Sequence, residues 1–534
     1  MRVAISAGEG GAGRIQRLAE DGTPLGPPEE AADLAATVRA IEAAERPRWV
    51  WADTTRVYPG LLASGVRLAR CHDVALVEAI ALAHEGRYGE PSSPGAAWAR
   101  LNGLPVPEER AETPEPQASL FEPEPPAFDE LEAAVAVHAA QLRRLPGPLP
   151  LLAAAESAGG LVAAEMTADG LPFRVDVHDE LLTSLIGPRP AHGMRPKGLQ
   201  ELADRIAAAF GRAVNPDSPA QIVKAFAAIG HPVPSTRSHV LKQVDHPVVP
   251  LLLRYKELSR LHTAHGWAWA DQWVSGGRFR PEYVVGGVVS GRWATRGGGA
   301  LQIPKIIRRA VIADPGWKLV VADAAQLEPR VLAALSGDRG LADAAGTTDL
   351  YAALADAFGG HRDRAKIALL SAMYGGGSGE ALQLLAVMRK RFPAAYAYVE
   401  DAARAGEDGR LVRSRLGRTC PPPSARWREL VSGPEGSRAA RDRGRFTRNF
   451  VVQATAAEWA LALLAALRRR LPDPARLVFF QHDEVVVHCP AGLSAEVAAA
   501  VHDAAEESRA LLFGDTPVRF PIEAVPVDSY ADAK

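Results

Sequence analysis

Two segments of the sequence present an aspartate at the end of an apolar run. In residues 318–330 the run 319–322 is typical of a buried strand and leads directly into Asp323. In residues 476–489 two apolar, β-rich runs are separated by four polar residues, which predicts a hairpin with Asp483 at its tip. Two strand-borne aspartates suit phosphoryl transfer with two divalent ions roughly 4 Å apart, one activating the attacking hydroxyl and one neutralising the leaving oxygen. The alternatives are that Asp323 caps the following helix and that the segments are unrelated turns.

A third segment, residues 361–377, repeats functional side chains every four residues: Arg362, Lys366, Leu370 and Tyr374. Spacing of four keeps such side chains on one slowly drifting helix face, and the glycines after Tyr374 predict the end of the helix. A nucleoside triphosphate requires cations for its phosphates and a flat or apolar group for its sugar and base. A solvated basic face is the alternative, but it would not explain why Leu370 and Tyr374 continue the stripe.

Arg445, Asn449 and Gln453 again have a spacing of four and share one face of a predicted helix. Arginine can bind a phosphate, while Asn and Gln can meet base edges in the minor groove, where every correct pair offers an acceptor. The alternative is an ordinary polar helix face.

Together these segments resemble the polymerase motifs of the family A DNA polymerases, the bacterial DNA polymerase I family. The resemblance covers roughly residues 151–534 and also includes the segments 290–292 and 301–304. The first motif runs from Asp323, Ala324 and Gln326 to Glu328 and Arg330; the second contains Arg362, Lys366, Tyr374 and Gly375; the third is Gln481, His482, Asp483 and Glu484.

The resemblance implies a role for each of these positions. Asp323 and Asp483, with the carbonyl of Ala324, would hold two Mg²⁺ ions, with Mn²⁺ as an alternative, and Lys366 would act as a general acid. The substrate-binding set is Arg362, Lys366, Leu370, Tyr374, Glu328, Gln326 and His482, and the set for primer–template DNA is Arg292, Arg445, Asn449 and Gln453. Glu328 stands where the family blocks a ribose 2′-hydroxyl, and Glu484 would support the metal site.

The sequence departs from the family pattern at two places. Ala324 and Ala325 replace the usual Tyr-Ser pair, which changes side chains but keeps the carbonyl of Ala324. Leu370 stands where an aromatic ring is usual, so recognition of the sugar is in question.

The fold class predicted for the chain is α/β (α+β) and multidomain. The resemblance implies a right-hand polymerase at 151–534, with a thumb near 196–275, fingers near 340–435 and a palm formed by the remainder. Residues 1–104, completed by a helix in 128–150, predict a small RNase H-like domain that resembles a 3′–5′ exonuclease without its carboxylates. Within it we expect a helix after Pro59 and a strand near residues 66–69. We expect Asp53 and Asp73 there to be structural, and no 5′-nuclease domain fits in this length.

The composition is compatible with this interpretation without demanding it. The chain has 534 residues and a net charge of −2. Residues 410–448 are nevertheless rich in arginine, and a protein needs such cations to bind a phosphate backbone. Three separated cysteines form no disulfide or metal pattern and suggest a reducing cytoplasm. No window of about 18 uninterrupted apolar residues occurs, so we expect no membrane span.

The segment 105–127 is rich in Pro and Glu, which predicts a mobile linker. Within it Gln117, Leu120 and Phe121 resemble the short peptides by which bacterial polymerases bind the sliding clamp. The alternative is that Leu120 and Phe121 fold back onto a neighbouring domain.

The sequence therefore predicts a monomeric, cytoplasmic DNA polymerase, associated with the nucleoid, that extends a primer on template DNA with deoxynucleoside triphosphates in replication or repair and lacks proofreading. The competing hypothesis is a catalytically idle scaffold that binds primer–template DNA.

Overall fold

The computed structural model describes residues 1–108, 128–191, 193–296, 299, 303–376, 379–434 and 436–533. Its described part divides into two compact units. The first comprises Met1–Ala168, Tyr283–Ala294 and Val320–Val525, and the second comprises Asp169–Glu282, Thr295–Leu319 and Pro526–Lys534.

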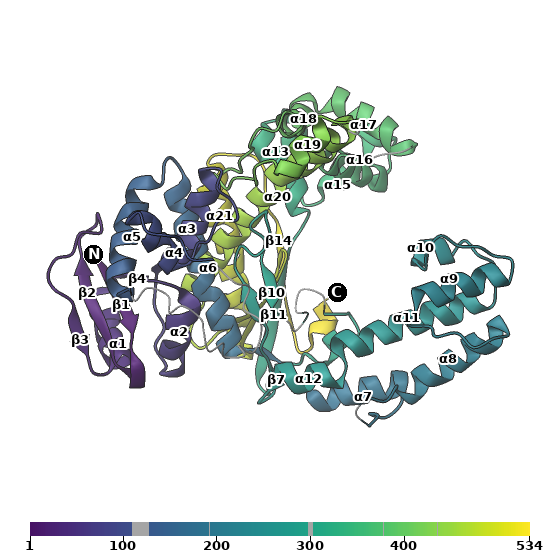
Figure 1. Cartoon of the computed structure of the whole chain (residues 1–534), viewed down its shortest axis with the longest axis horizontal. Coiled ribbons are helices and arrows are strands. Elements are labelled where there is room, and N and C mark those ends of the chain that lie inside the picture. Colours follow the sequence, from purple (N-terminus) through teal and green to yellow (C-terminus); the bar gives the residue numbers. More distant parts are fainter. Residues whose placement is uncertain are drawn as a thin grey trace. The chain divides into compact units, whose positions relative to one another are not determined.

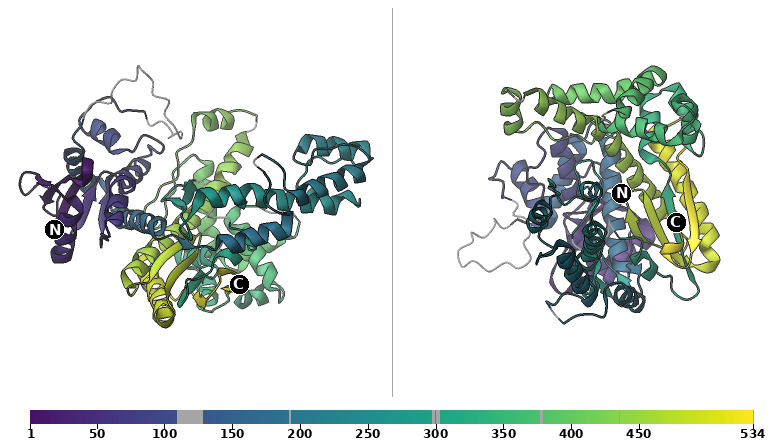
Figure 2. Two further views of the ribbon diagram at one scale, coloured as in Figure 1. Left: turned by 90° about the horizontal axis from the view of Figure 1, so that it is seen from below. Right: turned by 90° about the vertical axis from the view of Figure 1, so that its right-hand side faces the viewer.

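The N-terminal part of the first unit is a mixed sheet with helices, so its predicted α/β class is confirmed (Figure 1). The strands lie side by side in the order β3-β2-β1-β4-β5, with β1 antiparallel to β2 and parallel to β4. The strands are β1 (Arg2–Ala7), β2 (Gly13–Leu18), β3 (Glu29–Ala31), β4 (Arg48–Trp51) and β5 (Cys71–Asp73), with the single turn η1 (Glu9–Gly11). The helices are α1 (Leu34–Glu45), α2 (Thr54–Ala63), α3 (Val74–His84), α4 (Pro94–Leu101) and α5 (Glu130–Arg144). The purple strands of this sheet are also visible in the left view of Figure 2.

Two predictions for this part were wrong. The predicted strand at residues 66–69 is a loop, because Val66 and Leu68 turn into the hydrophobic core while the hydrogen-bonded strand is β5. The predicted helix after Pro59 begins earlier, at Thr54, because Asp53 accepts the Thr55 backbone N–H and starts the helix upstream of the proline.

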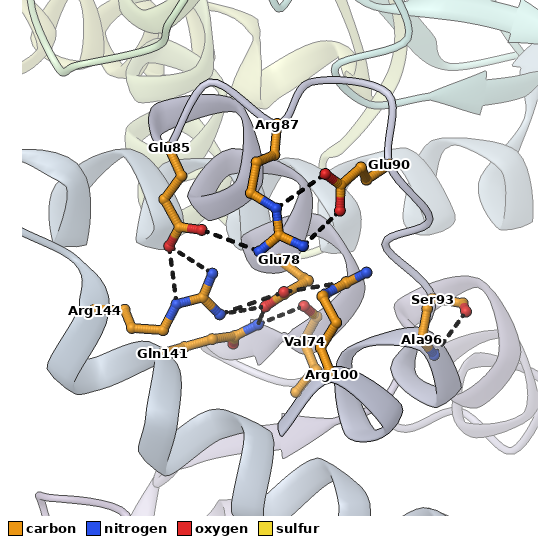
Figure 3. A network of polar contacts seen from close by, with 10 residues as sticks. All are labelled: Val74, Glu78, Glu85, Arg87, Glu90, Ser93, Ala96, Arg100, Gln141 and Arg144. Atoms are coloured by element: carbon orange, nitrogen blue, oxygen red, sulfur yellow. Dashed lines mark hydrogen bonds and ion pairs between the residues drawn. The ribbon is translucent and has the colours of Figure 1, made fainter. Parts of the chain in front are cut away.

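A buried carboxylate joins three helices of the N-terminal part (Figure 3). Glu78 of α3 is only 1% exposed and forms ion pairs with Arg100 of α4 and Arg144 of α5, each at 3.2 Å. Gln141 of α5 donates a further hydrogen bond to it at 3.1 Å. Since removing one partner of a buried pair typically costs about 3–5 kcal/mol, this network fixes α4 and α5, which flank residues 109–127 in the sequence.

The larger core of the first unit is built on a four-stranded sheet in the order β12-β13-β11-β14. Its strands are β11 (Trp317–Ala324), β12 (Arg476–Gln481), β13 (Glu484–Pro490) and β14 (Ile522–Val527). The helices α6 (Leu149–Asp169), α20 (Gly436–Arg470) and α21 (Ser494–Phe513) contribute to the same core, as does β9 (Glu282–Val284). The single turn η5 (Ala491–Leu493) connects β13 to α21. The predicted buried strand and the predicted hairpin are both confirmed.

Short helices fill the chain between β11 and α20. They are α13 (Leu327–Ser336), α14 (Arg339–Ala345), α15 (Leu350–Ala353), η4 (Ala355–Phe358), α16 (Arg362–Tyr374), α17 (Glu380–Arg391), α18 (Pro393–Glu407) and α19 (Ala425–Val431). The helix that follows Asp323 is α13, and the helix predicted from the spacing of four is α16.

The second unit is mainly helical. It contains α7 (Val175–Ile186), α8 (Lys197–Phe210), α9 (Pro219–Ala228), α10 (Ser238–Leu241), α11 (Val248–His265) and α12 (Trp267–Trp273). A small sheet has the order β6-β8-β7, from Leu171–Pro172, Arg278–Phe279 and Val274–Ser275; β10 (Ala294–Arg296), η3 (Ile307–Ala310) and η6 (Tyr530–Ala533) complete the elements. Lys256 of α11 donates to the backbone carbonyl of Thr236, which connects α11 to the segment just before α10.

Two helices, α6 and α20, are long and apolar enough to cross a membrane by length and composition alone. Their most apolar windows are 72% and 89% buried within the fold, as in core helices.

Candidate active site

The two predicted catalytic aspartates lie at neighbouring strand ends. Asp323 is the penultimate residue of β11, and Asp483 lies in the two-residue turn between β12 and β13. The turn is tight because His482 adopts a left-handed conformation, with φ of 58°. The backbone N–H of Ala324 donates to the carbonyl of Asp483 at 3.1 Å, and β11 lies beside β13 in the sheet, so the strand end is held next to the hairpin tip.

The donor set at these strand ends fits Mg²⁺. Both aspartates are half-buried, and carboxylate oxygens are the ligands this ion prefers. No cluster of three or more His, Cys, Asp or Glu side chains able to hold a metal occurs within the part of the chain that the structure describes. Mg²⁺ is commonly held by one or two carboxylates together with water and substrate phosphates, so a pair of aspartates is sufficient.

Helix α16 presents the predicted triphosphate-binding stripe on its outer face. Its inner face is buried and consists of Ala365, Ala368, Leu369, Ala372 and Met373. Arg362, Lys366 and Tyr374 are exposed, and Leu370 is half-buried against the core. Lys366 has no hydrogen-bond or ion-pair partner among the described residues. The helix ends at Gly375, where φ is 66° and an added Cβ would lie only 2.9 Å from Cγ of Arg445.

Two of the predicted substrate residues share a partner that the sequence did not indicate. Asp349 accepts hydrogen bonds from Nε2 of Gln326 and from Nε of Arg362, each at 2.8 Å. Burial alone would raise the pKa of Asp349, but the hydrogen bond from Arg362 and those from Ala352 N–H and Gln326 lower it to about 2. Gln326 is thereby held at the start of α13.

Four further predicted residues, from four separate segments, form one hydrogen-bonded cluster around Glu328. Arg292 forms an ion pair with one oxygen of Glu328, and the hydroxyl of Tyr374 donates to the other at 2.8 Å. Gln453 of α20 donates to the Tyr374 oxygen at 3.3 Å. Burial and the neighbouring negative charge of Glu328 raise the pKa of Tyr374. The structure thus brings the first motif, the second motif and α20 together, as the prediction requires.

The remaining predicted residues lie near this cluster or on the same elements. His482 is at the hairpin tip, where desolvation and then the positive charge of Arg292 lower its pKa. Arg445 forms an ion pair with Asp442 one turn earlier on α20. Asn449 is half-buried, and its side-chain oxygen accepts no hydrogen bond from the described residues. Gln117, Leu120 and Phe121 lie outside the described residues, as do Leu301 and Gln302.

Arg330 is a structural residue of the site whose role sequence reasoning missed. It is completely buried on α13, and burial lowers its pKa to about 10. Its guanidinium donates to the backbone carbonyls of Ala325, Ala345, Thr347, Thr348 and Arg519 and to the side chain of Gln326. These bonds compensate the desolvation of the charge and fix the segment between β11 and α13.

Sequence reasoning also missed an ion pair that lies beneath the loop that carries Arg292. Glu156 of α6 and Arg418 form a buried ion pair at 2.6 Å. An added Cβ at Gly291 would lie 2.2 Å from Nε of Arg418, and one at Gly286 would lie 2.4 Å from Oε1 of Glu156. The loop rests directly on this pair, so only glycine fits at these two positions.

The carboxylates of the N-terminal sheet make a different set of contacts. Asp53 accepts hydrogen bonds from the backbone and hydroxyl of Thr55, each at 2.7 Å. Asp73 is buried and accepts from the backbone N–H groups of Thr54 at 2.7 Å and Leu76 at 2.9 Å. Both carboxylates therefore begin helices, which agrees with the structural role predicted for them.

Comparisons with known proteins identify what the chain resembles. A family model described as DNA polymerase family A matches residues 195–526. Among curated proteins, DNA polymerase I of Chloroflexus aurantiacus is 27% identical over 289 residues, which are 48% of this chain and 30% of that protein. The thermostable DNA polymerase I of Thermus filiformis is 29% identical over 318 residues, 53% of this chain and 35% of that protein. The chain spans about a third of the length of these relatives.

Among solved structures, the fold matches the POL domain of Pol1 from M. smegmatis, determined in complex with DNA primer-template and dNTP. The TM-score is 0.73, and the match covers 99% of this chain and 95% of that one at 19% identity. The predicted fold class is confirmed by this match.

Proposed function

The chain belongs to DNA polymerase family A, and from this premise we propose that it is a template-directed DNA polymerase that adds deoxynucleotides to a primer 3′-hydroxyl. The observation that carries the proposal is the backbone bond between Ala324 and Asp483, which sets two carboxylates at adjacent strand ends. The M. smegmatis neighbour was solved with primer-template and dNTP, which supports the same partners here.

Members of family A use divalent metal ions. We assign their binding in this chain to Asp323, Asp483 and the carbonyl of Ala324, with two Mg²⁺ as the expected ions. Such ions, when bound, lower the pKa of the primer hydroxyl and neutralise the leaving oxygen.

The chain's own residues hold the substrates and move a proton. Arg362 binds the triphosphate through its guanidinium, and Lys366, exposed on the same face and without a partner among the described residues, donates a proton to the departing pyrophosphate. Tyr374 lies beneath the templating position, where its ring is held by its bonds with Glu328 and Gln453.

Glu328 and Leu370 are the residues that we expect to discriminate deoxyribose from ribose in the incoming nucleotide. Glu328 is fixed by Arg292 and Tyr374, so its carboxylate stands as a rigid block to a ribose 2′-hydroxyl. Leu370 offers an apolar contact without a ring.

A primer-extension assay with Mg²⁺ and four deoxynucleotides tests the proposal. Extension that follows the template, and that is lost in Asp323→Ala, supports it. Tight primer–template binding with no extension under any salt condition would instead favour the idle scaffold.

The segment around Gln117, Leu120 and Phe121 is proposed to bind the sliding clamp. Burial of the leucine and phenylalanine side chains contributes roughly 3–5 kcal/mol before ordering costs, so we expect micromolar affinity at best. Tethering would then lengthen synthesis through a high effective concentration. Clamp-stimulated extension that survives Leu120→Ala with Phe121→Ala would remove this assignment.

A further inference from the structure

Asp349 bonds two residues of the proposed nucleotide site, Gln326 at the start of α13 and Arg362 of α16. It is the N-cap of α15, where one carboxylate oxygen accepts the Ala352 backbone N–H at 3.1 Å. The same oxygen accepts Nε2 of Gln326, and the other oxygen accepts Nε of Arg362. A cap needs only the first of these bonds, so the other two call for a separate explanation.

The bond to Arg362 determines which edge of its guanidinium remains available. A guanidinium offers five donors in a fixed plane, and it binds phosphate best through two parallel N–H groups. Asp349 takes Nε, and the two terminal nitrogens of Arg362 have no partner among the described residues. The carbon of the guanidinium lies 5.5 Å from the centre of the Tyr351 ring, which limits rotation of the group.

The bond to Gln326 connects the same carboxylate to the catalytic strand. Gln326 follows Asp323 by three residues and adopts a left-handed conformation, with φ of 57°. Its side-chain oxygen accepts from the Leu350 backbone N–H at 2.9 Å and from Arg330 at 3.1 Å. The nitrogen of this amide therefore bonds Asp349 and its oxygen bonds the backbone of the next residue, Leu350.

We propose that Asp349 is a positioning residue that aims the terminal nitrogens of Arg362 at the incoming triphosphate and couples that arginine to the end of β11. This inference rests on the proposed function, since it assigns the triphosphate to Arg362. A carboxylate could instead compete with phosphate for the arginine, but a competitor would occupy the terminal nitrogens, whereas Asp349 leaves them available.

Single-nucleotide primer extension of four proteins tests the proposal: wild type, Asp349→Ala, Arg362→Ala and the double variant. We expect Asp349→Ala to raise KM for the incoming nucleotide about tenfold, as loss of one charge-assisted bond of about 1.4 kcal/mol predicts, with kcat changed only a few-fold. The double variant should be no worse than Arg362→Ala alone, because the effect of Asp349 passes through Arg362. Additive losses, or a lower KM in Asp349→Ala, would overturn the proposal.

Two controls separate positioning from folding. Asp33→Ala removes an equivalent N-cap from α1, where Asp33 accepts the Ala36 N–H at 2.9 Å, and should lower Tm without changing KM. Asp349→Asn keeps an acceptor oxygen for one donor and should fall between wild type and alanine in KM, which provides the test should Asp349→Ala fail to fold.

A binding readout distinguishes failure of this inference from failure of the proposed function. Stabilisation of the protein against heat by a deoxynucleoside triphosphate with Mg²⁺ needs no turnover. A wild type that is stabilised but does not extend primers contradicts the polymerase, whereas equal stabilisation of wild type and Asp349→Ala contradicts the role of Asp349 alone.

Discussion

The N-terminal sheet and the central sheet both carry aspartates at strand ends, yet they use them in opposite ways. After Asp53 and Asp73 a helix begins at the very next residue, so its free N–H groups reach back and bind the carboxylate. After Asp323 the helix α13 begins only at Leu327, and Gln326 in a left-handed conformation separates the two. After Asp483 the chain returns into a strand and offers no helix N-terminus.

This difference shows that the residue type alone does not decide the role of an aspartate. A carboxylate that immediately precedes a helix has its lone pairs occupied by backbone donors, and its loss costs stability. A carboxylate separated from the helix by a turn is not committed to capping. The first case describes the N-terminal sheet and the second describes the proposed metal site.

The largest expected effect tests the central-sheet half of the comparison. Asp323→Ala or Asp483→Ala should lower the rate of primer extension by about a thousandfold or more, because a metal site supplies several kcal/mol of transition-state stabilisation. Primer–template affinity should stay within a few-fold, since phosphate contacts elsewhere supply most of it. Single-turnover extension and a DNA-binding titration measure the two quantities. Near-normal turnover in either variant would contradict the metal assignment.

Lys366 extends the test from the strand ends to helix α16. Lys366→Ala should slow nucleotide addition by roughly a hundredfold, as loss of a general acid or a preorganised cation does. Arg364→Ala is the matched control, because Arg364 is an exposed cation of the same helix that pairs with Glu380 at 2.7 Å, away from the stripe. If both variants lost the same fraction of the rate, the positive charge of α16 as a whole would explain the effect, and the position of Lys366 would not.

Local sequence patterns predicted the elements that carry the site. The apolar run before Asp323, the paired runs around Asp483 and the spacing of four in α16 all depend on neighbours within a few residues. Three of the four residues at this spacing, Arg362, Lys366 and Tyr374, are exposed on α16, while Leu370 is half-buried against the core.

Contacts between distant segments could not be predicted in this way. Arg330 bonds the carbonyl of Arg519, 189 residues later, and Glu156 pairs with Arg418 across 262 residues. Asp349 was missed because its sequence neighbourhood shows only a helix cap, while its other two bonds depend on how α13 and α16 pack. Likewise, nothing in the pattern of residues 66–69 indicated that the paired strand would be β5.

Glu458 is a carboxylate of a third kind, neither a helix cap nor a proposed metal ligand. It lies on α20 and is fully buried. It accepts the Ser414 hydroxyl and the Leu416 N–H, and burial raises its pKa from 4.5 to about 7. Between these values the unfolded state loses the proton first, so the folded state binds more protons and stability falls as pH rises from about 4.5 to 7, by up to roughly 3 kcal/mol. Glu458→Gln should remove this loss, because the amide can donate to Ser414 and accept from Leu416 as the protonated acid does.

Denaturant unfolding at pH 5 and pH 8 measures the effect. The variant should match wild type at pH 5 and be more stable at pH 8. A variant that is less stable at both values would show that the ionised form is the one that the fold stabilises.

The smallest effect on synthesis is expected at Asp53, and it tests the N-terminal half of the comparison directly. Asp53→Ala should leave primer extension unchanged and lower the free energy of unfolding by about 1 kcal/mol, the usual cost of losing an N-cap. Asp33→Ala in the same domain should cost a similar amount, because it removes a comparable cap from α1. We also expect neither the wild type nor these variants to degrade a mismatched primer from its 3′ end in the presence of Mg²⁺. If the wild type removed mismatches and Asp53→Ala did not, the aspartate would be acting on a metal as well as on a helix, and the distinction drawn between the two sheets would no longer hold.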